Sequence, residues 1–277
     1  MFESLLTSPL KLSFFKETNF STFKIENFLS EEQYAALYKN IPHIPISEFK
    51  KYNSDFDNQS SQHKLKAFIT EVDPENYEKL IYKNNILNKF VQTMKSAKMI
   101  EILLKKFLYK VILSRRKDMK TLLKLLIRKN KATLNRSNSL FDRIFYNQFI
   151  TTVSFAYMAD GAQLFPHTDG MKKILSLMLY FPDENYCNNS GHDLDIGTTF
   201  YNSDEYGLTV KNINNKIKNI QDVNDFKKRN KVSLKFPFKK KNIYGFIKSH
   251  NSWHGLEPLQ IHKNFIRKNI NINLLLV

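Results

Sequence analysis

The sequence predicts an α+β fold in which a two-sheet jelly roll carries a layer of N-terminal helices. Apolar residues recur with helical spacing within residues 76–130. From residue 144 onward, short segments rich in β-branched and aromatic residues are separated by turns. We therefore expect a single domain over 1–277, mainly helical over 1–148, with a jelly-roll core over 149–277 that holds a basic insertion at 204–241.

The first predicted elements are a strand and a helix. Residues 23–29 alternate apolar and polar as far as Phe28, as a strand does. Ser30, followed three residues later by Gln33, is typical of a capping box at a helix start, and Pro42 marks the end of that helix. The polar, turn-rich residues 51–75 are expected to form a loop.

The helical layer is predicted from two amphipathic segments. Residues 99–113 contain an apolar stripe, and residues 119–127 form a second such piece with Lys and Arg around it. Basic amphipathic helices of this kind more often form a solvated face over a core than a membrane anchor.

The predicted strands of the jelly roll follow one another through the C-terminal half. They are expected at residues 150–157, 164–169, 174–181, 195–201, 242–248, 252–254 and 267–277. Asp160-Gly161 indicates a turn, and residues 188–191 indicate a loop.

Charge is distributed unevenly along the chain, whose formal net charge is +17. Residues 79–143 carry 18 Lys and Arg against three acidic residues, and residues 211–241 carry 11 against two. The chain also has 29 Asn, so AT-rich coding is one explanation of the abundant Lys. The other is an anionic partner of these two segments, such as a phospholipid surface, a nucleotide or an acidic polymer.

Cysteine usage and apolar runs indicate where the protein works. Cys187 is the only cysteine, so the chain cannot form an internal disulfide, which fits a reducing compartment. The first twenty residues lack the pattern of a secretory signal. No apolar run approaches the roughly 18 residues of a membrane span. We expect a cytoplasmic protein without an integral membrane segment.

A metal site is predicted from His167 and Asp169, which are two residues apart and would share one face of a strand. His254, which follows an apolar strand, is the best third ligand among the seven histidines. Two imidazoles and one carboxylate form the facial triad of non-haem Fe(II) oxygenases and leave three coordination positions open. Arg267 begins the last strand, and a buried guanidinium there would need an anion such as a dicarboxylate.

These residues together resemble the Fe(II)/2-oxoglutarate dioxygenases, in particular their prolyl-4-hydroxylase-like branch. The resemblance covers about 150–277 and, more weakly, 23–42. Further matching positions are Tyr157, the hydroxyl pair Ser176 and Tyr180, the segment Gly197-Thr198-Thr199-Phe200-Tyr201 and the segment Ser252-Trp253-His254-Gly255.

The resemblance implies a double-stranded β-helix and a set of residue roles. His167, Asp169 and His254 would hold Fe(II), and 2-oxoglutarate would chelate the iron with its far carboxylate on Arg267. Tyr180 would assist Arg267, and Tyr157 would face the cosubstrate. Dioxygen would then supply the oxygen for hydroxylation of an unactivated C–H bond, with release of succinate and CO2.

Several alternatives to this site remain open. His192, Asp193 and Asp195 form a rival cluster, although a loop of Asn and Ser precedes it. His250 and His254 are four residues apart, but Gly255 and Pro258 argue against the helix that a zincin needs. His167 and Asp169 would otherwise be a surface turn pair, Lys268 would point inward in place of Arg267, and Tyr157 and Tyr180 would be core residues only.

The substrate class is also open. A peptidyl side chain and a small molecule both fit the resemblance. An alkylated nucleobase fits less well, because the stretch Arg267-x-Asn269-x-Asn271-x-Asn273 lacks the Thr and the second Arg of the repair branch. We therefore do not expect a nucleic-acid partner. The non-enzymatic alternative is a catalytically inactive jelly-roll binding protein that uses its basic segments on an anionic partner, either a membrane surface or nucleic acid.

Overall fold

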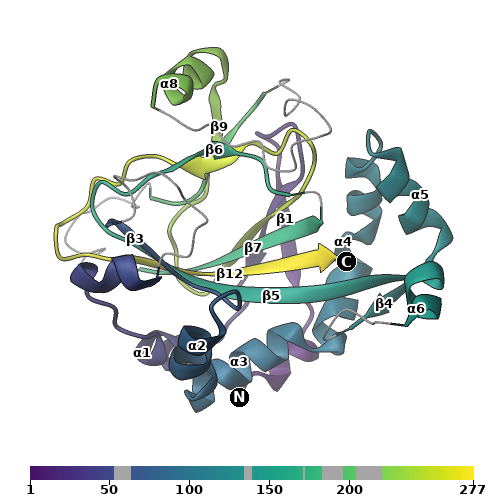
Figure 1. Cartoon of the computed structure of the whole chain (residues 1–277), viewed down its shortest axis with the longest axis horizontal. Helices are drawn as coiled ribbons and strands as arrows, with labels where there is room; N and C mark the ends of the chain where they lie inside the picture. The colour runs from purple at the N-terminus through teal and green to yellow at the C-terminus, as the bar shows by residue number, and fades with distance from the viewer. Residues whose placement is uncertain (53–63, 134–138, 171, 183–195, 204–219) are drawn as a thin grey trace.

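The protein folds into two β-sheets with helices on the outer face of the larger one (Figure 1). The computed structural model describes residues 1–52, 64–133, 139–170, 172–182, 196–203 and 220–277. The helical elements are η1 (Glu3–Leu6), α1 (Glu31–Asn40), η2 (Ile46–Tyr52), α2 (Pro74–Tyr77), η3 (Glu78–Tyr82), α3 (Asn85–Lys95), α4 (Ala97–Ser114), α5 (Met119–Ile127), α6 (Leu140–Phe145) and α8 (Ile220–Arg229). The strands are β1 (Lys11–Phe15), β2 (Thr22–Glu26), β3 (Lys66–Ile69), β4 (Lys129–Ala132), β5 (Tyr146–Met158), β6 (Leu164–His167), β7 (Lys173–Phe181), β8 (Thr199–Tyr201), β9 (Val232–Lys235), β10 (Ile243–Ile247), β11 (His254–Leu256) and β12 (Arg267–Leu276).

The larger sheet has the strand order β1-β2-β10-β7-β12-β5-β3, and β4 pairs in parallel with the start of β5. The smaller sheet has the order β6-β11-β8-β9. All the other strand pairs are antiparallel, so each central strand exposes alternate residues to opposite sides. This alternation divides the apolar residues of the larger sheet between two cores.

One core lies between the larger sheet and the helices, and the other lies between the two sheets. Along β7, Leu177 and Leu179 pack toward the helices, whereas Met178 and Tyr180 belong to the second core. Phe200 of the smaller sheet completes that second core. The space between the sheets is therefore largely apolar, and polar side chains within it call for an explanation.

The helical layer is built on α3 and α4, which bury their apolar faces against the larger sheet. Helix α3 buries Leu87, Phe90, Val91 and Met94, and α4 buries six residues. The predicted capping box at α1 is confirmed, because Ser30 accepts from the Gln33 backbone while the Gln33 side chain accepts from the Ser30 backbone.

The structure departs from the predicted elements at three places. Residues 66–69 form the edge strand β3, not a loop, because Ala67 and Ile69 are buried against β5. The basic insertion contains α8 and β9, and β9 extends the smaller sheet. The strand predicted within 23–29 is present as β2, and β1, β3 and β4 add further strands to the larger sheet, so the segment 1–148 contributes more strands than expected. The loop predicted at 188–191 lies outside the described residues.

Within the described ranges, no helix is both long and apolar enough to cross a bilayer.

The packing of α3 predicts a matched pair of stability effects. Phe90 is fully buried and its ring meets that of Phe2 edge-on, with the centroids 5.3 Å apart. Phe90→Ala should lower the free energy of unfolding by about 3–5 kcal/mol, measured by urea denaturation. Phe145→Ala serves as the control, because Phe145 is 53% exposed and its loss should have little effect. Equal effects of the two variants would contradict the described core.

Candidate metal and cosubstrate site

The two candidate histidines are brought together by strand pairing in the smaller sheet. His254 on β11 pairs directly with His167 on β6, and directly opposed residues of antiparallel strands place their side chains on the same face. The centroids of the two imidazole rings are 4.4 Å apart. Gly255 permits this close pairing, since a Cβ there would lie 2.5 Å from the carbonyl oxygen of Leu164.

Asp169 completes the cluster, but it lies outside the strand on which it was predicted. Strand β6 ends at His167, so Asp169 lies just beyond the strand and not on its face. Its carboxylate still turns back to the histidines, with Oδ2 3.6 Å from Nε2 of His254. One ligand atom from each of His167, Asp169 and His254 lies within 4.8 Å of the others. The three predicted residues therefore come together, but Asp169 was expected on the strand and lies beyond its end.

Hydrogen bonds to the backbone set the tautomer of both imidazoles. Nδ1–H of His167 donates to the carbonyl of Phe165 at 2.8 Å, and Nδ1–H of His254 donates to the carbonyl of Ser252 at 3.0 Å. In a neutral ring Nε2 is then the nitrogen with a lone pair, as a metal ligand requires. Burial, together with the nearby His167, lowers the pKa of His254 to about 3. Its contact with Asp169 therefore joins a neutral ring to a carboxylate and is not an ion pair.

Lys173 is a site residue that sequence reasoning missed. Its Nζ lies 2.7 Å from Oδ1 of Asp169, and the backbone carbonyl of Lys173 accepts from Nη2 of the buried Arg115 at 2.7 Å. Burial alone would raise the pKa of Asp169, but the charges around it, Lys173 foremost, hold the pKa below its usual value. Oδ2 of Asp169 is buried and has no hydrogen-bond partner among the described residues. Asp169 thus offers one oxygen atom to a ligand.

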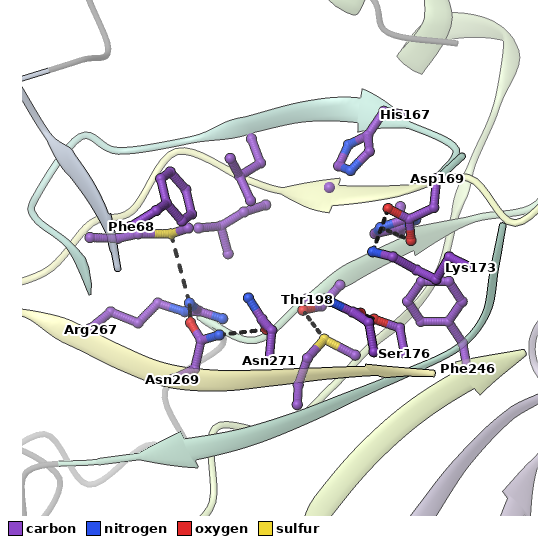
Figure 2. Close-up of a pocket in the computed structure, with 17 residues that line it drawn as sticks. Phe68, His167, Asp169, Lys173, Ser176, Thr198, Phe246, Arg267, Asn269 and Asn271 are labelled. Carbon is purple, nitrogen blue, oxygen red and sulfur yellow. Dashed lines mark hydrogen bonds and ion pairs between the residues drawn. The ribbon is translucent and has the colours of Figure 1, made fainter. Parts of the chain in front are cut away.

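A cavity of about 130 Å³ extends from this cluster between the two sheets. Figure 2 shows His167 and Asp169 at one end of the pocket and Arg267 at the other. Phe68, from the edge strand that had been predicted as a loop, lines the same pocket. The cavity therefore joins a cluster of three metal-ligand side chains to a single guanidinium.

Arg267 points into the cavity, as predicted, and is only 3% exposed. Its Nε donates to the carbonyl of Ile196 at 2.6 Å, and its Nη1 donates to Oδ1 of Asn269 at 2.5 Å. No acidic partner of this guanidinium occurs within the part of the chain that the structure describes. Burial lowers the pKa of Arg267. A buried cation with only neutral partners is costly, so this one is suited to an anionic ligand.

A row of amides continues from Arg267 along the cavity face of β12. Asn269 donates to Asn271 at 2.7 Å, and Asn273 accepts from Ser176 at 2.8 Å. Alternate positions of the strand, from Ile270 to Leu274, belong to the helix-side core, so the odd-numbered positions all face the site. Ser176 lines the pocket, as predicted. The period-2 pattern of Arg267 and the asparagines was visible in the sequence, but it did not show that the asparagines line the cavity together with Arg267.

The two tyrosines predicted at the cosubstrate lie on different faces. Tyr180 is close to the site, because its ring centroid is 5.2 Å from Cζ of Arg267, although its hydroxyl is engaged with Thr198 at 3.0 Å. Tyr157 does not face the cavity, which corrects the prediction. It occupies a helix-facing position of β5 and packs in that core near Phe49, with the ring centroids 6.5 Å apart. Strand alternation places Tyr157 and the pocket-lining Met158 on opposite faces.

Three alternatives to this site concern Lys268, a second metal cluster and a zincin motif. Lys268 lies on the other face of β12 from Arg267, with its Nζ 5.9 Å from the ring centroid of Tyr38 on α1. His192, Asp193 and Asp195 lie outside the described residues. His254 is in a strand, so the pair His250 and His254 does not form the helical motif of a zincin.

Comparisons with known proteins give distant structural likenesses only. No protein-family model and no curated protein sequence matches the chain. Among solved structures, it is similar to a prolyl-4-hydroxylase from Pseudomonas putida, with 10% identity, a TM-score of 0.45 and 94% of each chain covered. It is also similar to a viral collagen prolyl hydroxylase from Paramecium Bursaria Chlorella virus-1, with 13% identity, a TM-score of 0.38, and 92% of this chain and 89% of that one covered. For EctD from S. alaskensis the identity is 11%, the TM-score 0.43, and the coverage 93% and 73%. At these TM-scores the likenesses carry no weight in assigning the site.

The geometry predicts that the His-Asp-His cluster binds a divalent metal. Asp169→Asn and His254→Ala should each weaken binding of Mn(II), used as a divalent probe, by at least roughly tenfold. Isothermal titration calorimetry would measure the affinity. His43→Ala, which removes an exposed histidine far from the cluster, should bind like the wild type. Unchanged affinity in the folded Asp169→Asn variant would exclude Asp169 as a ligand.

Proposed function

We propose that the protein is an Fe(II)/2-oxoglutarate-dependent oxygenase that hydroxylates an unactivated C–H bond. The observation that carries the proposal is that one cavity contains a His-Asp-His cluster and a buried Arg267 that has no acidic partner among the described residues. In this interpretation the two sheets form a double-stranded β-helix, the fold expected from the sequence. The prolyl-4-hydroxylase-like branch is part of the proposal and rests on the sequence resemblance.

The residues present fit an iron site. Two imidazoles present Nε2 because their Nδ1 atoms are held by backbone carbonyls, and Asp169 contributes a buried Oδ2 without a hydrogen-bond partner among the described residues. Nitrogen and carboxylate ligands without thiolate suit Fe(II) and leave positions open for a chelating ligand. Lys173 occupies the other carboxylate oxygen, so Asp169 would bind through one atom.

The residues at the other end fit the far carboxylate of 2-oxoglutarate. Arg267 presents a planar fork suited to a bidentate carboxylate contact, and Asn269 and the carbonyl of Ile196 hold that fork in place. Tyr180 and Phe238 pack beside the guanidinium, with ring centroids 5.2 and 5.5 Å from Cζ. These contacts restrain the side chain before any ligand arrives, which reduces the entropy lost on binding.

With iron bound, the centre supplies oxidation by dioxygen, which consumes 2-oxoglutarate and a C–H substrate and yields succinate, CO2 and an alcohol. The protein's own residues position the cosubstrate and exclude water. Arg267 and the row of amides orient the cosubstrate, and Lys173 holds Asp169 in its ligating direction. Phe246, whose ring centroid is 4.5 Å from that of His254, and Leu256 add apolar walls to the pocket that help to exclude water.

The substrate is proposed to be a small molecule or a peptidyl side chain. A cavity of about 130 Å³ that also receives the cosubstrate has room for one reacting group, not for a bulky one. In this proposal Arg267 binds the cosubstrate. The other polar groups on the cavity face of β12 are the neutral amides of the asparagines, so this face has no second cation to bind the phosphate backbone of a nucleic acid. A nucleic-acid substrate is not part of the proposal.

Enzymatic turnover should require the proposed metal ligands. Wild-type protein incubated with cell extract, Fe(II) and 2-oxoglutarate should release succinate and add one oxygen atom to a component of the extract, detected by mass spectrometry. Asp169→Asn should abolish both signals, whereas His43→Ala should leave both unchanged. Wild-type protein that binds metal and 2-oxoglutarate but never releases succinate would instead support the alternative of an inactive binding protein.

The cosubstrate anchor can be tested against its neighbour on the same strand. Arg267→Gln should raise the dissociation constant of 2-oxoglutarate for the Mn(II)-loaded protein by roughly 10–100-fold, because hydrogen bonds to charged groups contribute about 1.5–3 kcal/mol. The dissociation constant of the Arg267→Lys variant should lie between those of the wild type and Arg267→Gln, because Lys retains the positive charge but lacks the planar fork of the guanidinium.

Lys268→Gln is the matched control, because it removes a cation one residue away that faces the helices. It should leave the affinity for 2-oxoglutarate unchanged. The reverse pattern, a strong effect of Lys268→Gln and none of Arg267→Gln, would refute the anchor assignment.

A further inference from the structure

Helices α5 and α6 differ from the other helices of the basic segment in how little they bury. Helices α3 and α4 bury four and six residues, respectively, against the rest of the protein. Helix α5 buries only Leu125, and α6 buries no residue. These two helices therefore add little to the core, although their sequences are rich in Leu, Ile and Phe.

The apolar side chains of α5 and α6 are exposed and follow helical spacing. The exposed large apolar residues in this region are Met119, Leu123, Leu126 and Ile127 on α5, and Leu140, Phe141, Ile144 and Phe145 on α6. Their exposed fractions run from 47% to 77%. Intervals of three and four residues place those of each helix on one face. An exposed apolar cluster of this kind marks an interaction surface.

The two helices are held at the same edge of the molecule. Nη1 of Arg128, at the end of α5, donates to the carbonyl of Arg143 in α6 at 2.9 Å. Lys131 of β4 forms an ion pair with Asp142 of α6, also at 2.9 Å. Figure 1 shows α5, β4 and α6 together beside the end of α4. We call residues 116–133 and 139–145 the α5–α6 surface.

Cations outnumber acids on this surface. Its described residues, 116–133 and 139–145, include eight Lys and Arg and two acidic residues. Both acids have local roles, since Asp118 caps α5 through the Thr121 backbone and Asp142 pairs with Lys131. Partial burial, together with nearby Arg128 and Lys120, lowers the pKa of Lys124, so like charges are crowded here. An anionic partner would relieve that repulsion.

A basic cavity adjoins the start of α5. It has a volume of about 370 Å³, and its lining includes Lys110, Arg116, Lys117 and His250. None of the described residues that line it is acidic. A cavity with this lining has room and charge for a phosphate group, and Arg116 and Lys117 link it to the residues that precede α5.

We propose that the α5–α6 surface docks on an anionic phospholipid bilayer, with its apolar side chains inserted among the lipids and its cations on the phosphates. A bilayer interface meets both features at once, since it takes up apolar side chains and attracts Lys and Arg. Nucleic acid would use the cations but leave eight large apolar side chains in water. A second copy would bring two strongly basic surfaces together. The proposal does not depend on the oxygenase chemistry.

Vesicle flotation of the full-length protein tests the apolar part of the proposal. The wild type should float with vesicles of phosphatidylcholine containing 30% phosphatidylglycerol and remain unbound with phosphatidylcholine alone. Leu126→Ser and Ile127→Ser together should lower binding at least tenfold. Val72→Ser, which removes an exposed apolar residue elsewhere (66% exposed), should bind like the wild type. Phe141→Ser on α6 gives an independent test if the α5 double variant fails to fold, as judged by circular dichroism.

A second pair of variants tests the charges. Lys120→Gln with Lys124→Gln should weaken flotation and reduce its dependence on salt concentration, whereas Lys39→Gln with Lys50→Gln, on the opposite side of the molecule, should not. Three results would overturn the proposal: no binding of the wild type to anionic vesicles, binding unaffected by the Ser variants, or a wild-type dimer that the same Ser variants dissociate. Tighter binding to duplex DNA than to the anionic vesicles would overturn it as well.

Discussion

The pairing of β6 with β11 is the constraint on which the site depends. It sets His167 directly opposite His254, and the backbone carbonyls of Phe165 and Ser252 then fix which nitrogen of each ring is available. These bonds form within each local segment, so the histidines are oriented before any metal is present. Preorganisation of this kind keeps two imidazoles and a carboxylate together.

A second constraint is the buried guanidinium of Arg267 between the two sheets. The space there is mostly aromatic and aliphatic, and a cation in it is costly without an anion. Strand β12 accommodates both apolar and polar residues because its side chains alternate between two faces. Ile270 and Ile272 complete the helix-side core, while Arg267 and Asn269 face the cavity. One strand thus serves stability on one face and ligand binding on the other.

The sequence singled out the three residues of the His-Asp-His cluster and Arg267, which the structure brings to one cavity, because residue types that bind metals and anions are recognisable without tertiary information. The predictions from sequence failed where tertiary packing determines which way a side chain faces or which segment pairs as a strand. Tyr157 was predicted to face the site, but the register of β5 turns it toward the helices. Lys173 was missed because nothing local shows that it reaches Asp169. Strand β3 was taken for a loop, since its pairing partner is more than 80 residues away in the chain. The exposure of the apolar faces of α5 and α6 could not be inferred either, because their pattern is the one that buried amphipathic helices also have.

The most direct test of the account is a crystal structure with Mn(II) and 2-oxoglutarate, using the anomalous signal of the metal. We predict an anomalous peak bound by Nε2 of His167, Nε2 of His254 and Oδ2 of Asp169, with ligand density continuing from the metal to Arg267. A metal peak elsewhere, or 2-oxoglutarate whose far carboxylate does not reach Arg267, would contradict it.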